Sequence, residues 1–169
     1  MKIVNFIFYA LWLIVLAVLQ TTVVQWIGIF NITPNLIFVF VILGAFVRGK
    51  AAGALCGAIF GLVFDLMTGR LIGVNMILFM YAGFFAGVLC ERFINGTDIL
   101  TTGIVLLVMS TVCSLVYYIA YSMMWPGIGF IKAFFRVIIP EAFYTAVIGI
   151  ILKIPIQKSF KIIQRRNMF

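Results

Sequence analysis

Long apolar runs separated by short polar turns are the feature that most constrains this chain. Hydrophobic residues make up 66% of the 169 residues and charged residues 9%, whereas an average soluble domain has roughly 45–50% apolar and about 25% charged residues. A helix needs roughly 20 residues to cross a hydrocarbon core about 30 Å thick. The recurring runs therefore predict an all-α integral membrane protein with a single transmembrane domain and no separate soluble domain.

The apolar runs predict six transmembrane helices, at residues 3–26, 35–47, 51–67, 71–89, 99–125 and 137–154, followed by a basic tail at 155–169. The second is short, because 13 residues span only about 20 Å. It either tilts among protein neighbours or starts earlier, near Ile29; Pro34 favours a start close to Asn35. Fusing residues 35–67 into one helix would leave Arg48 and Lys50 in the middle of the membrane, which is costly.

Basic residues are distributed unequally between the two sides of this six-helix arrangement. One side receives Lys2, Arg48, Lys50, Arg92, Lys153, Lys158, Lys161, Arg165 and Arg166, and the other receives Arg70, Lys132 and Arg136. Loops rich in Lys and Arg stay in the cytoplasm, so both termini are predicted to be cytoplasmic. The tail mixes apolar and basic residues in a pattern suited to an anionic inner leaflet.

Composition leaves little material for chemistry. The chain has no His, and its four acidic residues are Asp65, Glu91, Asp98 and Glu141. The three cysteines lie far apart, without the close pairing of zinc or redox motifs. The net charge of +8 is spread between apolar runs instead of forming one basic face, so nucleic acid is not an expected partner. We expect no catalytic residues, no metal site and no cofactor.

Glycines at four-residue spacing mark a helix-packing or partner-binding face. Gly53, Gly57 and Gly61 lie on one side of the third predicted helix, and Gly83 and Gly87 repeat the spacing on the fourth. Small residues at this spacing let two helix backbones approach closely within a membrane. The third and fourth helices are therefore expected to pack on each other, while contact with another protein through the same face stays open.

Asp65 continues the glycine face and is followed, after a short turn, by Arg70, Gly73 and Asn75. An ionisable group at membrane depth needs a partner. Arg70 is the nearest opposite charge, so one interpretation is a structural Asp65–Arg70 pair. The other is contact with a partner protein or a ligand.

Glu141 lies about one turn into the last predicted helix, after Pro140, and Lys132 and Arg136 precede it. This spacing favours local neutralisation of the carboxylate. The apolar residues of the connector before this helix recur at helical spacing, so the connector is expected to lie in the outer interface.

The segment Gly61-Leu62-Val63-Phe64-Asp65, followed by Leu71-Ile72-Gly73-Val74-Asn75, resembles the signature region of the rod shape-determining protein MreD family. The N-terminal anchor, the Pro34-Asn35-Leu36 start of the second helix and the basic tail fit as well. The resemblance implies a non-enzymatic scaffold in the bacterial inner membrane that binds MreC. Through MreC it would be linked to MreB and to peptidoglycan synthesis enzymes, and so maintain cell shape.

Two other classes of function are weighed against this one. The MreD family is similar in fold to the substrate-binding subunits of energy-coupling-factor vitamin transporters, but the polar side chains available for a vitamin site are few. A membrane enzyme would need paired acids or a nucleophile with its base. Asp65 and Glu141 are far apart in sequence and would serve only if the fold brought them together.

Overall fold

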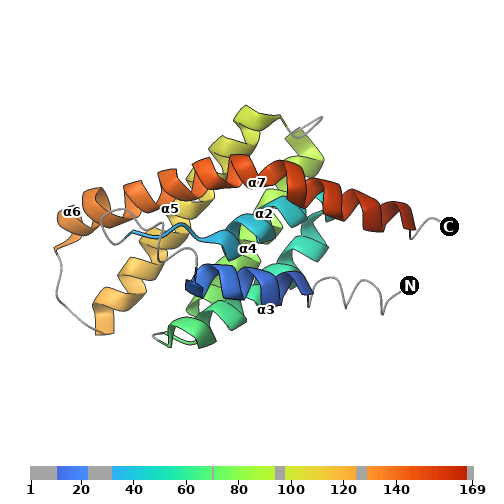
Figure 1. The fold of residues 1–169 in the computed structure, drawn as a ribbon. Helices are drawn as coiled ribbons and strands as arrows, with labels where there is room; N and C mark the ends of the chain where they lie inside the picture. The colour runs from blue at the N-terminus through green and yellow to red at the C-terminus, as the bar shows by residue number, and fades with distance from the viewer. Residues whose placement is uncertain (1–10, 23–31, 70, 94–97, 125–128, 167–169) are drawn as a thin grey trace.

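The computed structural model describes residues 11–22, 32–69, 71–93, 98–124 and 129–166. Its elements are a short helix, Leu11–Thr22, then α2 (Leu36–Arg48), α3 (Lys50–Thr68), α4 (Val74–Phe93), α5 (Ile99–Met124), α6 (Phe130–Ala133), the π-helical turn η1 (Phe134–Ile138) and α7 (Ile139–Arg166). The fold is therefore all-helical, as predicted (Figure 1).

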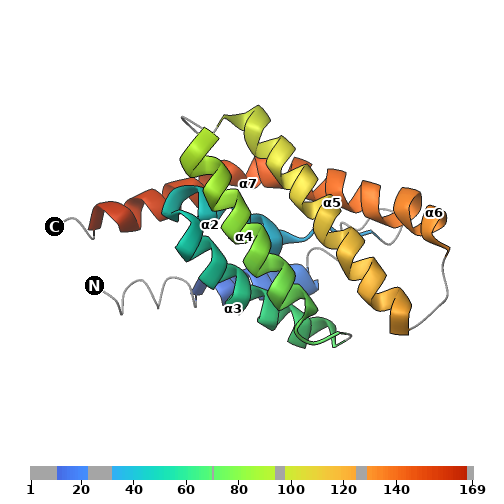
Figure 2. The same ribbon diagram turned by 180° about the vertical axis from the view of Figure 1, so that it is seen from behind.

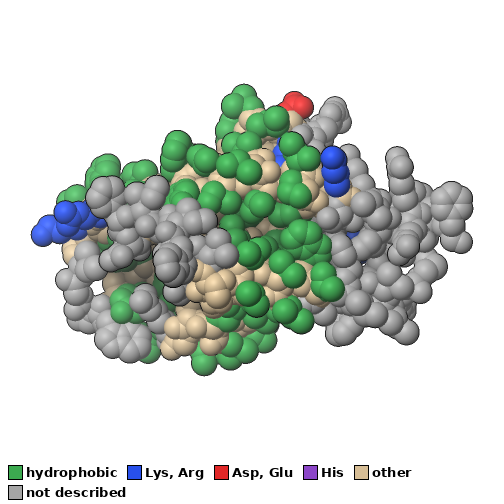
Figure 3. Space-filling view, viewed as in Figure 1, with side chains coloured by type: hydrophobic (Ala, Val, Ile, Leu, Met, Phe, Trp, Pro, Cys, Tyr) green, Lys and Arg blue, Asp and Glu red, His purple; other side chains and the backbone are tan. Residues whose placement is uncertain are grey.

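Within the described ranges, four helices are long and apolar enough to cross a membrane. They are Lys50–Thr68, Val74–Arg92, Ile99–Met124 and Phe130–Lys158, and the helices Leu11–Thr22 and Leu36–Arg48 are apolar but shorter. Apolar side chains cover the middle of the described surface and basic side chains lie toward its two ends (Figure 3). This distribution fits a multi-pass membrane protein, because apolar side chains favour the hydrocarbon and charged ones the interfaces.

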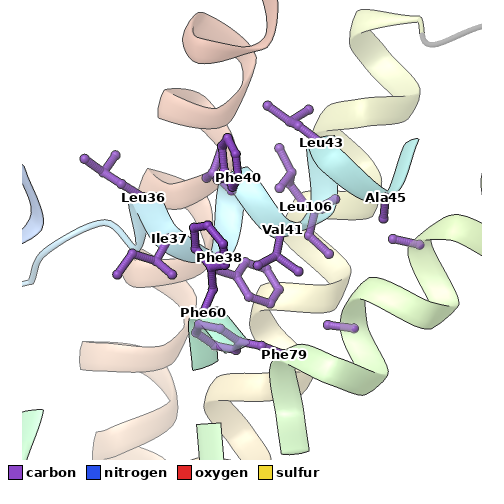
Figure 4. Packing of buried hydrophobic residues seen from close by; sticks show 14 of the residues in the cluster. Leu36, Ile37, Phe38, Phe40, Val41, Leu43, Ala45, Phe60, Phe79 and Leu106 are labelled. Atoms are coloured by element: carbon purple, nitrogen blue, oxygen red, sulfur yellow. The ribbon is translucent and has the colours of Figure 1, made fainter. Parts of the chain in front are cut away.

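The short helix α2 forms the centre of the bundle. Every residue from Leu36 to Phe46 is buried, and the ring of Phe38 lies 5.2 Å from that of Phe79 on α4, while Phe40 stacks on Phe60 of α3 at 5.1 Å (Figure 4). The helix contacts α3, α4 and α7. A helix of 13 residues spans only about 20 Å, and this length is tolerated because its neighbours enclose it.

The start of α2 decides between the two interpretations of its length. The Asn35 side chain accepts a hydrogen bond from the Phe38 N–H at 2.9 Å and so caps the helix, as asparagine commonly does at this position. An earlier start near Ile29 is therefore wrong. At the other end, Gly49 adopts a φ of 83° between α2 and α3, a conformation that glycine reaches without strain, so residues 35–67 form two helices as predicted.

Besides the short helix Leu11–Thr22, two pairs of helices make up the rest of the described bundle. The antiparallel α3 and α4 form a closely packed hairpin, and α5 packs mainly on α7 (Figure 2). The helix that begins as α6 continues through η1 and α7, past Pro155, as far as Arg166. The connector before the last predicted span is thus helical and continuous with it, and the helix extends beyond Ile154 into the basic tail.

Candidate functional site

The hairpin of α3 and α4 brings together most of the residues singled out in the sequence. A Cβ atom added to Gly53 would lie 2.6 Å from the Gly83 carbonyl oxygen, and one added to Gly61 would lie 2.5 Å from the Asn75 carbonyl oxygen. A Cβ on Gly57 would collide with the Phe79 carbonyl. Each step of four residues up α3 is matched by a step of four down α4, so the two backbones touch along the length of the hairpin.

Asp65 lies at the end of this contact and is completely buried. Its Oδ1 accepts hydrogen bonds from the Asn75 side-chain amide at 2.8 Å and the Asn75 N–H at 3.3 Å. Its Oδ2 accepts from the N–H groups of Gly73 at 2.8 Å and Met76 at 3.1 Å. The carboxylate thus caps the start of α4, where free N–H groups and the helix dipole favour a negative charge.

The hydrogen bonds of Asp65 also limit its chemistry. A carboxylate has about four lone-pair positions, and the four contacts to Gly73, Asn75 and Met76 use that capacity. Gly73 has a φ of 96°, which turns the chain so that these donors converge. Arg70 lies outside the described residues, so the Asp65–Arg70 pair stays a prediction.

The opposite end of the hairpin has a second carboxylate cap. Glu91, near the end of α4, accepts a hydrogen bond from the Lys50 N–H at 3.1 Å through Oε1, and its Oε2 lies 3.2 Å from the Lys50 Nζ. A Cβ on Gly87 would collide with the Lys50 backbone, and one on Gly49 would lie 2.7 Å from Glu91 Oε1. Gly87 therefore lets the backbone at the start of α3 approach α4, and Gly49 leaves room for the Glu91 carboxylate.

Glu141 has a different environment from the one expected. The Ser114 hydroxyl of α5 donates to Glu141 Oε2 at 3.3 Å. The carboxylate is thus bonded across helices to a hydroxyl, whereas local neutralisation by Lys132 or Arg136 was expected. Asp65 accepts its hydrogen bonds from the start of α4, whereas Glu141 accepts its hydrogen bond from α5. The two acids therefore have hydrogen-bond partners on different helices.

A polar group that the sequence analysis missed holds the start of α2 inside the bundle. The Gln20 side chain donates to the Pro34 carbonyl at 3.0 Å and accepts from the Leu36 N–H at 2.9 Å. The hydroxyl of Thr145 on α7, a fully buried residue, accepts from the Asn35 N–H at 3.2 Å. Irregular backbone at membrane depth requires such partners. The signal in the sequence was an amide or a hydroxyl within an otherwise apolar run, as at Gln20 and Thr145.

The part of the chain that the structure describes holds no cluster of three or more His, Cys, Asp or Glu side chains that could bind a metal ion. In the hairpin, the backbones of α3 and α4 are in contact along their length, and a carboxylate caps a helix start at each end. Such an arrangement holds helices in one relative position.

A family described as rod shape-determining protein MreD matches residues 1–163 of the chain. No curated protein and no solved structure matches it.

Proposed function

Because the chain belongs to the rod shape-determining protein MreD family, we propose that it is a membrane scaffold of the bacterial cell-elongation machinery, without catalytic activity of its own. In this role it binds MreC and, through MreC, links MreB filaments to the enzymes of peptidoglycan synthesis. The family match supports a role in determining rod shape; the partners are part of the proposal.

The observation that best supports a scaffold is the use of Asp65. An ionisable residue buried at membrane depth is a functional candidate by default, and a catalytic or ligand-binding acid needs a free oxygen lone pair. The oxygens of Asp65 are occupied by Gly73, Asn75 and Met76. The acid therefore fixes the geometry of the α3–α4 hairpin, and a fixed geometry is what a partner-binding scaffold requires.

The proposal includes an arrangement in the bacterial inner membrane. The four long helices, together with the two shorter apolar ones, would give six spans with both termini in the cytoplasm. Lys50 and Glu91 would then lie at the cytoplasmic end of the hairpin and Asp65 near its outer end. The excess of basic residues on the cytoplasmic side supports this orientation.

The proposal is tested by co-expressing the tagged chain with MreC, solubilising the membranes gently and measuring how much MreC is retained. In parallel, the chain is expressed in rod-shaped cells that lack their own copy, and the ratio of cell length to width is measured. We expect MreC to be retained and rod shape to be restored. Retention of energy-coupling ATPases and their membrane subunit in place of MreC, with cells that stay round, would refute the scaffold and favour a vitamin-transport subunit.

A further inference from the structure

Glu141 leaves most of its hydrogen-bonding capacity unused. A carboxylate has about four lone-pair positions, and within the described ranges this one accepts a single hydrogen bond, from the Ser114 hydroxyl at 3.3 Å. Hydrogen bonds from a hydroxyl to a carboxylate are usually about 2.5–2.7 Å long, so this bond is weak. Asp65, by contrast, accepts four hydrogen bonds. Glu141 can therefore accept a further donor, whereas Asp65 cannot.

The hydrogen bond to Ser114 holds Glu141 deep in the membrane. Ser114 lies ten residues before Met124, the last residue of α5, and fifteen residues after Ile99, the first. These intervals correspond to about 15 Å and about 22 Å, so the carboxylate is far from both ends of a membrane-spanning α5. Lipid tails cannot solvate a carboxylate, and acidic residues inside a membrane commonly pair with a basic one.

The described part of the chain supplies no basic partner for Glu141. No Lys or Arg in it forms an ion pair with this carboxylate, and Lys132 and Arg136, which precede Glu141 in the same continuous helix, are exposed. Lys153 lies twelve residues further along α7, or about 18 Å away along the helix. The natural source of a cation is therefore another molecule.

The side of α5 that carries Ser114 also carries aromatic rings. Three half-buried tyrosines follow Ser114 at helical spacing, Tyr117, Tyr118 and Tyr121. The Tyr118 ring lies 5.9 Å from that of Phe130, the first residue of α6, so this side of α5 is turned toward the helix that carries Glu141. Aromatic ring faces attract ammonium and guanidinium groups. A carboxylate beside such rings favours a cationic ligand.

Packing is loose between the Ser114–Glu141 hydrogen bond and the Met124 end of α5. Ser110 is buried, but no residue of α5 from 111 to 124 is, and the ends of α5 and of the α6–α7 helix diverge in both views (Figures 1 and 2). Exposed side chains near the hydrogen bond are apolar, as at Val112 and Phe143. A free cation would have to leave water to reach this depth, whereas a basic side chain is carried there by the helix of a membrane protein.

We propose that Glu141 binds the ammonium or guanidinium group of a Lys or Arg side chain from another membrane protein, with the Ser114 hydroxyl holding the carboxylate in position and the tyrosines of α5 beside the cation. This inference rests on the proposed function, since it assigns a contact of the scaffold to a membrane partner. It goes beyond that function in naming the residue that makes the contact and the chemical class of the group it binds.

The contact is tested by co-expressing MreC with the tagged chain and measuring MreC retention after gentle solubilisation. Glu141→Gln keeps the shape of the side chain and an oxygen for Ser114 but removes the charge, so retention should fall at least about tenfold, as when one partner of a buried charge pair is lost. The control is Glu91→Gln, the same change at an exposed acid, which should retain MreC as the wild type does. Unchanged retention with Glu141→Gln, or an equal fall in both variants, would overturn the inference and leave the proposed function standing.

The chain purified without MreC separates this contact from two other roles of Glu141. Its thermal unfolding temperature should be the same for Glu141→Gln and the wild type; a clear loss in the variant would mean that Glu141 holds α5 on α7 and would overturn the inference. Ethylamine should stabilise neither protein. Stabilisation of the wild type alone would assign the site to a small amine instead of a partner's side chain.

A charge exchange identifies the cation. Glu141→Arg should abolish MreC retention by repulsion, and each Lys and Arg in or beside the membrane segment of MreC is then replaced by Glu in turn. One of these replacements should restore retention by Glu141→Arg while lowering retention by the wild-type chain. Restoration by none of them would overturn the inference, whereas failure of the wild-type chain to retain MreC would refute the proposed function itself.

Discussion

The two ends of the α3–α4 hairpin use the same device in different surroundings. At each end, a carboxylate from the last turns of one helix accepts backbone hydrogen bonds at the start of the other. Asp65 is completely buried and bonded to neutral N–H donors, whereas Glu91 is paired with Lys50, and their side chains are 42% and 52% exposed. Since water can replace the partners of Glu91 but not those of Asp65, the two caps should contribute very differently to stability.

The largest effect is expected where both caps are disturbed together. Gly57 lies in the middle of the hairpin, and even a Cβ there would collide with the Phe79 carbonyl. Gly57→Leu should therefore separate the helices and lower the free energy of unfolding by more than about 3 kcal/mol. The measurement is the thermal unfolding temperature of the purified protein in detergent.

A matched control for the Gly57 variant is Ala51→Leu, because Ala51 lies on the exposed face of the same helix. Its unfolding temperature should stay close to that of the wild type. If both variants unfolded at the wild-type temperature, close backbone contact would not be what holds the hairpin together.

Removing the buried cap alone should have the next largest effect. Asp65→Ala leaves the N–H groups of Gly73, Asn75 and Met76 without an acceptor in a buried site. Each unsatisfied buried group costs about 1–3 kcal/mol, so we expect a loss of about 3 kcal/mol or more, measured as reduced thermal stability. The nearly isosteric Asp65→Asn, which keeps one acceptor oxygen, should lose less. Equal losses in the two variants would show that neither the shape nor the single remaining acceptor stabilises the hairpin and that the ionised carboxylate is required.

A smaller loss is expected when one donor is removed and the carboxylate is kept. Asn75→Ala deletes the side-chain amide that donates to Asp65 Oδ1 at 2.8 Å, but leaves the three backbone donors. We expect about 1–2 kcal/mol of destabilisation, typical of one hydrogen bond to a charged group. Combining Asn75→Ala with Asp65→Ala provides the check, because the double variant should be little worse than Asp65→Ala alone if the two side chains act through the same contact.

Sequence periodicity was sufficient to identify the α3–α4 hairpin but not the carboxylate caps at its two ends. The spacing of Gly53, Gly57 and Gly61 depends only on the helical repeat, so the face they share could be predicted without a structure. The hydrogen bonds of Asp65 could not, because the nearest opposite charge in sequence is Arg70, whereas three of the four donors are backbone N–H groups that every residue carries. Of this cap, only the Asn75 side-chain amide leaves a mark in the side-chain sequence.

The same limit explains what was missed around α2. A short apolar segment is ambiguous by composition, and its complete burial depends on neighbours that are distant in the chain. Gln20 and Thr145 become informative only once the fold places them beside residues 34–36. The Ser114–Glu141 hydrogen bond likewise joins two helices whose pairing the sequence did not specify.

Removing the exposed cap, Glu91, should have the smallest effect on the thermal stability of the hairpin. Glu91→Gln keeps an oxygen that can accept from the Lys50 N–H but removes the charge that attracts the Lys50 Nζ. Exposed ion pairs contribute little because water and salt screen them, so the unfolding temperature should fall only slightly, and the difference between variant and wild type should shrink at high salt. A loss as large as that of Asp65→Asn, insensitive to salt, would mean that Glu91 is shielded from water in the folded protein. The contrast between a buried and an exposed cap would then be wrong, and the hairpin would be closed equally firmly at both ends.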